Sequence, residues 1–336
     1  MGLNITKLVE PKTISLDDLK NKKIAVDASQ MLYQFLSSIR QPDGTPLMDS
    51  NEDVTSHLMG ISTRIPNLIE KGMKLVFVFD GKPPILKSLE KEERAHRKRL
   101  AQEKLELAKE EGDEELMLKY SKQTSILTRK MAEEAMELIS AFGLPVIQAP
   151  SEAEAQCAYM AKNGDVWGIS STDYDSLLYS TPRLLRNLTL SDKRRVRGKL
   201  IFIKPEIIEL NDFLRKLELN NEQLIILGIL VGTDYNNKGI SGIGPMKALK
   251  LVKENNDYEK MFLGLKPDFD WKEIYNIFKE MPVTKDYSLD WKSPNADKIY
   301  EILSSHDFNR ERINKLIERL TKKSISQKGL SSFFNS

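Results

Sequence analysis

Acidic side chains follow four apolar segments that are typical of buried β-strands. Asp27 comes after "KIAV", Asp80 after "LVFVF", Glu152 after "PVIQAP" and Asp173 after "VWGISST". A single acid in such a place is ordinarily the N-cap of the next helix. Four acids in equivalent places indicate a shared site, because sites in open α/β sheets form at the carboxyl ends of the strands.

Two of these positions carry a second acid two residues further along. "PSEAEAQCAYM" at 150–160 contains Glu152 and Glu154, and "STDYDSLLY" contains Asp173 and Asp175. A structural alternative exists for the first pair, in which Ser151 caps a helix and Glu154 completes a capping box. We expect Ser151 to cap the helix and both glutamates to serve mainly as metal ligands. With one more acid after the apolar run "LIILGILVG", the candidate ligands are Asp27, Asp80, Glu152, Glu154, Asp173, Asp175 and Asp234.

Such a set of carboxylates would raise its own pKa values and destabilise the fold unless cations neutralised it. Mg²⁺ prefers carboxylate oxygens and retained waters. Two ions about 3.5–4 Å apart can stabilise the attacking and leaving oxygens of a phosphodiester during in-line displacement by water. The single cysteine excludes an internal disulfide and a cysteine-based zinc cage, and the three histidines argue against a histidine-rich transition-metal site.

The segment 82–122 is almost wholly polar and helix-forming, and its basic residues lie nearest Asp80. They are Lys82, Lys87, Lys91, Arg94, Arg97, Lys98, Arg99 and Lys104. A solvated helix with i, i+4 ion pairs is the structural alternative. The functional interpretation is a basic helical lid over the acids, on which Lys87 and Arg94 share a helix face and stabilise charge on the scissile phosphate.

Two further segments are candidates for phosphate contacts. In "GISGIGPMKALKLV", Gly242 and Gly244 permit tight turns and Pro245 suits a first helical position, so the start of that helix can bind a DNA phosphate. This pattern indicates a helix-hairpin-helix. The basic run "KRRVRGK" at 193–199 is expected in a hairpin loop, either simply solvated or in contact with phosphate.

The elements that must position these residues alternate between strands and helices. Strands are expected at 22–29, 74–81, 144–150, 165–173 and 199–204, and helices are expected before Gly143 and Gly164. This alternation predicts an α/β fold whose mostly parallel sheet is covered on both faces. The chain has 336 residues and a formal net charge of only +2, so a nucleic-acid partner is inferred from local charge alone.

The N-terminus lacks the apolar run of a signal peptide, and no segment reaches 18 uninterrupted apolar residues. We therefore expect an intracellular protein that has no membrane partner.

Five motifs together resemble those of the structure-specific 5′ nucleases, most closely the flap endonuclease family in its archaeal form. They are "AVDASQMLYQFL", "FVFDGKPPILK", "PSEAEAQCAY", "TDYDSLLY" and "GTDYNNKGISGIGPMKAL". The resemblance implies a PIN-like nuclease core with a helical arch and two Mg²⁺ ions, for which Mn²⁺ can substitute. It also implies 5′-flap endonuclease and 5′–3′ exonuclease activity on branched DNA, in Okazaki-fragment processing and base excision repair.

The resemblance assigns roles to individual residues. The seven acids match the family's metal ligands, and Lys87 and Arg94 match its catalytic basic pair. Tyr33 matches an aromatic residue that stacks on a base, although core packing is the alternative for Tyr33 considered alone. Gly2 matches a substrate-contacting N-terminus, and the turn at Gly242 and Gly244 resembles a K⁺-assisted grip on duplex DNA.

The resemblance also implies a monomeric organisation with one nuclease domain over 1–322 and a flexible tail over 323–336. Within the domain lie an N-terminal part (1–98), an internal part (116–258), the arch (about 82–122) and the helix-hairpin-helix (about 222–255). The tail sequence "QKGLSSFF" resembles the box that binds the trimeric sliding clamp of replication (PCNA), through Gln327, Leu330, Phe333 and Phe334. Packing of these apolar residues on the parent domain is the alternative.

Two other functions remain open at this point. A PIN-type ribonuclease would share acids at strand ends but would not need the arch, the Gly-Pro hairpin or the clamp box. A non-catalytic DNA-binding scaffold would use the acids only as helix caps and surface charge.

Overall fold

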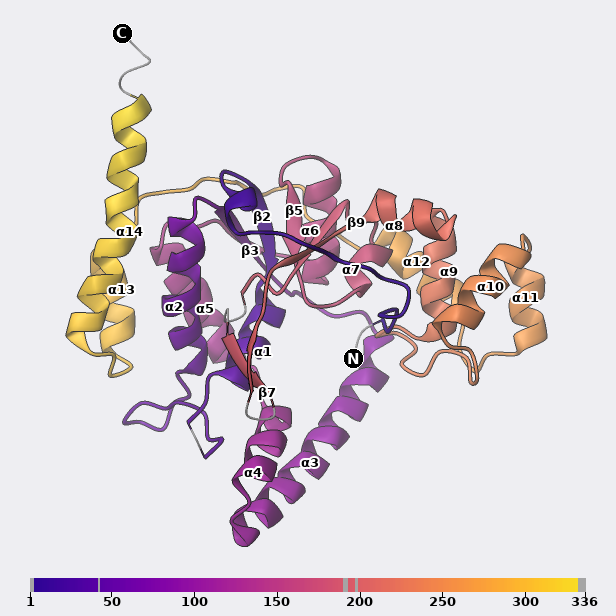
Figure 1. Cartoon of the computed structure of the whole chain (residues 1–336), viewed down its shortest axis with the longest axis horizontal. Helices are drawn as coiled ribbons and strands as arrows, with labels where there is room; N and C mark the ends of the chain where they lie inside the picture. The colour runs from indigo at the N-terminus through magenta and orange to yellow at the C-terminus, as the bar shows by residue number, and fades with distance from the viewer. Residues whose placement is uncertain (1–2, 42, 190–192, 197–198, 332–336) are drawn as a thin grey trace.

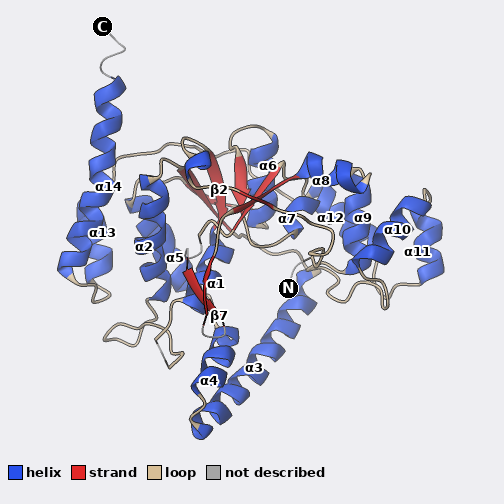
Figure 2. Ribbon diagram, viewed as in Figure 1, coloured by secondary structure: helices blue, strands red, loops and turns tan. Residues whose placement is uncertain are grey.

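A computed structural model of the protein describes residues 3–41, 43–189, 193–196 and 199–331. Seven strands of this described chain form one sheet in the order β1-β9-β6-β5-β2-β3-β4. Their bounds are β1 Lys12–Thr13, β2 Lys23–Asp27, β3 Lys74–Phe79, β4 Val146–Gln148, β5 Gly168–Ser170, β6 Arg183–Arg186 and β9 Glu206–Glu209. Neighbours from β6 to β4 pair in parallel, whereas β9 and β1 join antiparallel at one edge. The expected α/β fold with a mostly parallel sheet is confirmed (Figure 2).

The two faces of the sheet are buried in separate hydrophobic clusters. Ile24 and Val26 of β2 belong to one cluster and Ala25 to the other, because successive side chains of a strand point to opposite faces. Helices α1 Ala28–Ser38, α2 Ser56–Glu70, α5 Arg129–Ala141, α13 Ala296–Ser304 and α14 Arg310–Ser331 contribute to the first cluster. Helices α6 Ala153–Lys162, α7 Asp175–Leu178, α8 Leu210–Leu217 and α9 Asn221–Val231 contribute to the second, with α10 Pro245–Glu254, α11 Tyr258–Leu265 and α12 Trp271–Glu280. Figure 1 shows the sheet between these layers.

Two predictions for the segment 193–204 were wrong, because its residues form a separate two-stranded sheet. The basic run at 193–199 is not simply a loop, because β7 Lys193–Val196 is a strand that pairs antiparallel with β8 Lys199–Phe202. The predicted strand at 199–204 therefore belongs to this separate hairpin and not to the main sheet. Its apolar pattern was right for a strand, but pairing partners depend on residues far along the chain. The short strands β1, β6 and β9 were not predicted.

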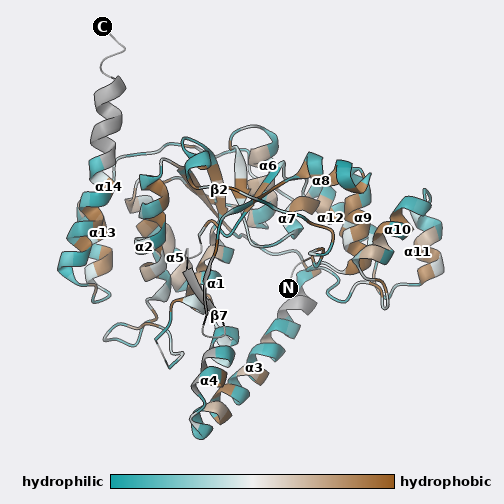
Figure 3. Ribbon diagram, viewed as in Figure 1, coloured by the Kyte–Doolittle hydropathy of each residue, from teal (hydrophilic) through white to brown (hydrophobic). Residues whose placement is uncertain are grey.

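Two helices occupy the polar segment that was expected to form an arch. Helix α3 Lys87–Glu111 ends at Gly112, which has a φ of +68°, and α4 Glu114–Ser121 packs back against it. Short 3₁₀ turns lie at Lys122–Thr124 after α4 and at Asp17–Leu19 before β2. Figure 1 shows α3 and α4 as a V that projects from the body, and Figure 3 shows that α3 is largely hydrophilic. Where α4 packs against α3, Ala101, Leu105 and Ala108 of α3 are buried.

The region expected to be a helix-hairpin-helix consists of α9, a turn and α10. Asn220 and Gln223 form a capping box at the start of α9. Helix α10 begins with Pro245 at its first position after Gly244, as the sequence predicts. Gly242 has a φ of +74°, and a side chain at either glycine would meet open space. The backbone of this turn is thus exposed.

A connection at 281–295 crosses the sheet from α12 to α13 and anchors the last two helices. The Lys292 N–H donates to Gly143 O at 2.8 Å, and the Asn295 N–H donates to Ala141 O at 2.8 Å. Gly143 ends α5 with a φ of +80°, and a Cβ there would lie 2.2 Å from Lys292 O. Gly143 is therefore required both by its own conformation and by the crossing chain.

No helix among the described residues is long and apolar enough to cross a bilayer.

Two histidines join the C-terminal helices to the first cluster through one glutamate. The buried His57 Nε2 lies 3.0 Å from Glu134 Oε2, and His306 Nε2 lies 3.5 Å from Glu134 Oε1. His306 Nδ1 lies 2.7 Å from Asp49 Oδ2 in the loop before α2. Glu134 therefore links its own helix, α5, to α2 and to the α13–α14 turn.

We predict that Glu134→Ala lowers the free energy of unfolding by about 1–3 kcal/mol, because it leaves the ring of His57 buried without its carboxylate. Thermal and urea unfolding measure the change. The matched control is Glu133→Ala on the same helix, whose exposed i, i+4 pair with Arg129 is expected to contribute about 0–0.5 kcal/mol. Equal losses in the two variants would contradict the bridging role.

Candidate nuclease site

Four of the predicted acids meet at one edge of the sheet. Strands β5, β2, β3 and β4 are parallel neighbours, so their carboxyl ends lie side by side. Asp27 ends β2 and Asp80 follows β3, while Glu152 and Asp173 follow β4 and β5. Asp27 also accepts the Gln30 N–H at 2.9 Å and so caps α1. The capping and site interpretations of Asp27 are therefore compatible.

The start of α6 shows that Ser151 was wrongly predicted as its cap. The N-cap residue is Glu152, without a side-chain capping bond. The Ser151 hydroxyl instead donates to Lys82 O at 3.1 Å. Asp80 Oδ1 accepts the Ala153 N–H at 2.8 Å, so an acid from the neighbouring strand end caps this helix. Neither glutamate is held in a capping box.

The remaining acids come from α6, α7 and the turn after α9. Glu154 lies on the first turn of α6, Asp175 begins α7 and Asp234 follows Gly232. The Leu3 N–H donates to Asp175 Oδ1 at 3.1 Å, which ties the N-terminal segment to the site. Three elements that are distant in sequence thus add their carboxylates to the strand-end acids.

Burial and mutual repulsion both act on these carboxyl groups. Asp27, Glu152 and Asp175 are only 7%, 8% and 5% exposed. Burial raises the pKa of Asp27, Glu154 and Asp175 well above their usual values, and neighbouring acids raise it further. Asp80 acts in this way on Asp27, and Asp173 acts on Glu154 and Asp175. The acids form one electrostatically coupled group.

The base of the arch supplies positive charge to this group. Lys87 Nζ lies 2.5 Å from Glu152 Oε2 and 3.4 Å from Asp234 Oδ2, and Arg94 Nη2 lies 3.2 Å from Asp234 Oδ2. Burial by itself would lower the pKa of Lys87, but the charges of Glu152 and Asp234 outweigh it and raise that pKa. Lys87 is therefore held as a cation. The two basic side chains reach the acids from one face of α3, as their spacing predicts.

A cavity of about 600 Å³ opens beside these ion pairs under α3. Tyr33, Asp80, Lys87, Arg94, Lys98 and Glu152 are among its lining residues. Tyr33 is 38% exposed, and Lys98 Nζ lies 5.5 Å from the centre of its ring. The alternative of core packing for Tyr33 is therefore wrong, and its ring is available to a ligand.

The donor set fits divalent cations such as Mg²⁺. All seven groups are carboxylates, and the raised pKa values of Asp27, Glu154 and Asp175 reflect burial and negative charge that bound cations would relieve. No three His, Cys, Asp or Glu side chains of the described residues form a ready-made cage. Two of the acids are instead paired with Lys87 or Arg94. Because Mg²⁺ keeps several waters and needs only one or two protein carboxylates, such spacing is compatible with binding.

Comparison with known proteins identifies the family of the chain. Residues 3–101 match the XPG N-terminal domain and residues 143–234 match the XPG I-region. Flap endonuclease 1 of Hyperthermus butylicus is 48% identical over 331 residues, which are 96% of this chain and 95% of that protein. Flap endonuclease 1 of Pyrococcus abyssi is 48% identical, with 99% of this chain and 98% of the relative covered. The chain belongs to the flap endonuclease family.

Solved structures of related nucleases share the fold. Flap endonuclease-1 from Methanococcus jannaschii superposes with a TM-score of 0.77 at 39% identity, covering 96% of this chain and 98% of that one. The catalytic core of Rad2 in complex with DNA substrate gives a TM-score of 0.67 at 25% identity, covering 92% and 96%. The resemblance to the flap endonuclease family and the PIN-like nuclease fold are thereby confirmed.

Several residues of this flap endonuclease family member were not foreseen around the acids. Gln30, Ser171 and Ser176 contact acids or the loops that carry them. The hydroxyls of Tyr179 and Tyr235 lie 2.8 Å apart in the core beside Asp234. A serine two residues before Asp173 and another just after Asp175 were the only signal in the sequence, and serine is common in loops.

Some predicted contacts cannot be placed. Gly2, Phe333 and Phe334 lie outside the described residues, and so do the side chains of Gln327 and Leu330. The backbone of α14 continues to Ser331. Gly242 and Gly244 lie in the turn between α9 and α10, where a Cβ at either position would meet open space.

The raised carboxyl pKa values predict how stability depends on pH and metal. A folded-state pKa above the unfolded value means that the folded state binds more protons, so this stabilisation is present below about pH 4. It is lost as the pH rises toward the folded-state pKa values of Asp27, Glu154 and Asp175. In chelator, we expect the melting temperature to fall between about pH 5 and neutral pH, and Mg²⁺ to restore it.

Thermal unfolding across this range, with and without Mg²⁺, is the measurement. Glu154→Gln removes one titrating group and is expected to flatten the decline in chelator. Identical slopes for the wild type and Glu154→Gln would show that this carboxyl group does not carry the effect.

Proposed function

We propose that the acids beneath the arch form the active site of a metal-dependent 5′-flap DNA endonuclease. The observation that carries the proposal is the contact of Lys87 and Arg94 with Glu152 and Asp234, which brings the arch and the acids into one site. Flap cleavage, 5′–3′ exonuclease activity and roles in replication and base excision repair agree with membership of the flap endonuclease family.

The acids would hold two Mg²⁺ ions, with Mn²⁺ as a substitute. Asp27, Asp80, Glu152, Glu154, Asp173, Asp175 and Asp234 are the proposed ligands. When bound, the ions supply an activated water and polarise the scissile phosphate. Lys87 and Arg94 leave their carboxylate partners for the oxygens of that phosphate and stabilise its developing charge. Their positions at the base of α3 place both cations on the cavity wall.

The contacts with DNA use other surfaces of the chain. Tyr33 stacks on a base next to the scissile phosphate, which its exposed ring in the cavity supports. Gly242 and Gly244 present backbone N–H groups at the start of α10 to a duplex phosphate, with K⁺ as a bridging ion. Gly2 contacts the substrate from the N-terminus, which Leu3 anchors near Asp175.

The enzyme acts as a monomer inside the cell.

The alternatives differ in what they leave unexplained. A PIN-type ribonuclease needs neither the α3–α4 arch nor the exposed turn before α10. A non-catalytic scaffold gives no reason to bury several carboxylates together at a free-energy cost. One cleavage assay distinguishes both alternatives from the flap endonuclease.

The test is cleavage of an end-labelled 5′-flap duplex, beside a matched RNA duplex and a plain single strand, with Mg²⁺ and with chelator. We expect a metal-dependent cut at the flap junction and little cleavage of the other substrates. Cleavage of the RNA alone would establish the ribonuclease, and an intact but bound flap would favour the scaffold.

We also propose that residues 1–322 form the nuclease domain and that the tail at 323–336 binds the trimeric sliding clamp. The support is the sequence "QKGLSSFF", in which Leu330, Phe333 and Phe334 form a small apolar set beside Gln327. Phe333→Ala with Phe334→Ala should abolish binding to the clamp in calorimetry without changing flap cleavage in its absence. Unchanged binding would refute this use of the tail.

A further inference from the structure

Two serine hydroxyls converge on a single oxygen of Glu154. Ser171 Oγ lies 2.8 Å and Ser176 Oγ lies 2.9 Å from Glu154 Oε1. Both serines come from the segment 171–176, which also carries two of the acids, whereas Glu154 comes from α6. Two donors on one oxygen fix the rotation of the carboxylate, so Oε1 is engaged and the direction of Oε2 is set.

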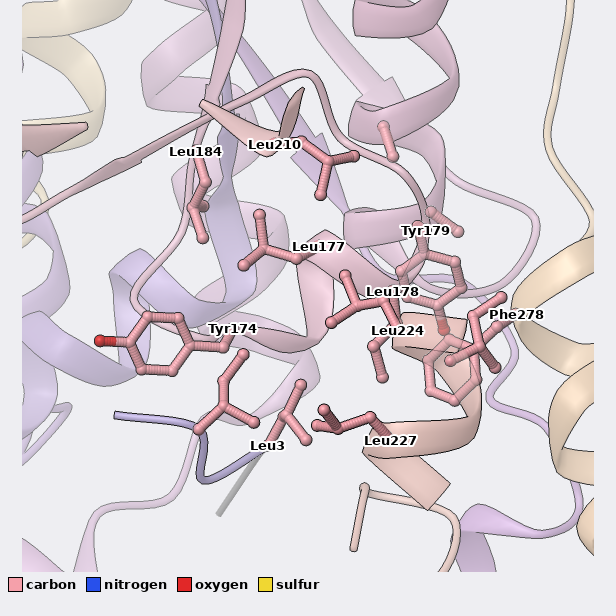
Figure 4. Packing of buried hydrophobic residues seen from close by; sticks show 14 of the residues in the cluster. Leu3, Tyr174, Leu177, Leu178, Tyr179, Leu184, Leu210, Leu224, Leu227 and Phe278 are labelled. Carbon is pink, nitrogen blue, oxygen red and sulfur yellow. The ribbon is translucent and has the colours of Figure 1, made fainter. Parts of the chain in front are cut away.

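The segment that carries these serines is itself rigidly held. Ser171 is 4% exposed and Ser176 is fully buried. The Ser171 N–H donates to Leu185 O of β6 at 3.2 Å, which extends the sheet pairing beyond β5. Figure 4 shows Tyr174 of this segment, with Leu177 and Leu178 directly after it, packed in the buried cluster. The serine side chains are therefore held rigidly, and they orient the longer side chain of Glu154.

The single proton of Ser171 has two neighbouring acceptors. Its Oγ lies 2.8 Å from Glu154 Oε1 and 2.9 Å from Gln30 Oε1, and it accepts the Asp173 N–H at 3.1 Å. The Thr172 N–H already donates to Gln30 Oε1. A hydrogen bond to a charged acceptor is stronger than one to a neutral amide oxygen, so the hydroxyl donates to Glu154 whenever Glu154 is the carboxylate that a bound cation requires. Ser171 thus couples the carboxylate of Glu154 to the backbone of Asp173.

We propose that Ser171 and Ser176 are positioning residues that orient Glu154 as a metal ligand. This inference rests on the proposed function of the acids as a divalent-cation site. The serines touch neither metal nor substrate and act only through Glu154. Ligating carboxylates are commonly held by such hydrogen bonds, and loss of these partners costs about 10–100-fold in metal affinity or activity.

The experiment measures Mn²⁺ binding to the full-length protein without DNA, by electron paramagnetic resonance of the free ion. Ser171→Ala with Ser176→Ala is expected to weaken binding about 10–100-fold. In cleavage assays, the same variant should need more Mn²⁺ for half-maximal rate, while KM for flap DNA stays unchanged. Ser171→Thr keeps the hydroxyl and should restore the affinity that Ser171→Ala loses.

The matched control is Ser62→Ala in α2, whose buried hydroxyl has no hydrogen-bond partner among the residues that the structure describes. It should leave Mn²⁺ binding unchanged. Melting temperatures in chelator distinguish the positioning role from a purely structural role of the two serines. In the structural case, their loss would lower stability without changing Mn²⁺ affinity.

The outcomes distinguish this inference from the proposed function. If Glu154→Gln weakens Mn²⁺ binding but the serine variants behave like Ser62→Ala, the positioning role is overturned and the metal site stands. If Glu154→Gln binds Mn²⁺ as tightly as the wild type, the assignment of Glu154 to the metal site fails and the positioning role fails with it.

Discussion

Alanine in place of Asp80 or Asp173 is expected to abolish cleavage of a 5′-flap duplex while binding of the same DNA largely survives. Asp80 follows β3 and Asp173 follows β5, on either side of Asp27 at the edge of the sheet. Loss of one carboxylate weakens the hold on cations that stabilise the transition state far more than the bound ground state. We expect the rate to fall at least about 10³-fold, which corresponds to about 4 kcal/mol of activation free energy.

Single-turnover cleavage and DNA binding at fixed salt are the two measurements. Asp80 also accepts the Ala153 N–H, so Asp80→Asn, which retains an acceptor oxygen, separates loss of charge from loss of the helix cap. The control is Asp212→Ala on α8, an exposed acid that pairs with Lys12. Turnover in both Asp80→Ala and Asp173→Ala would contradict the assignment of these acids to a nuclease site.

Lys87→Ala and Arg94→Ala are expected to give a different kind of defect. Each removes a cation from the scissile phosphate and should lower kcat by about 10²–10³-fold, as loss of one preorganised donor commonly does. Lys87 now neutralises Glu152 and Asp234, so its removal leaves the acids more negative. Mn²⁺ binding should therefore persist or tighten in Lys87→Ala, in contrast to the variants of the acids.

The measurements are kcat on the flap substrate and Mn²⁺ binding without DNA. Lys109→Ala is the matched control, because Lys109 lies at the far end of α3 and pairs with Glu106 in an exposed contact. It should cleave at the wild-type rate. A loss of Mn²⁺ binding together with kcat in Lys87→Ala would indicate that this lysine supports the site structurally and does not act on the phosphate.

The sequence alone was sufficient to predict the type of site, because the relevant signals are local. Apolar runs followed by Asp27, Asp80, Glu152 and Asp173 indicate parallel strands whose ends carry acids. Parallel strands joined by helices must place those ends on the same edge, so the acids were expected together before any contact was known. The spacing of Lys87 and Arg94 likewise predicted a shared helix face. Only the tertiary structure could show that this face of the helix points toward the acids.

The tertiary structure decided which residues contact one another. Ser151 was a reasonable cap for α6 by local pattern, yet the cap is Asp80, which lies 73 residues away from Ala153 in sequence. The segment 199–204 had a strand pattern, but its partner β7 placed it outside the main sheet. Ser171 and Ser176 carry no signal until α6 is packed beside them. Sequence patterns report the preferences of neighbouring residues, whereas such contacts depend on how distant elements pack and which polar groups are buried together.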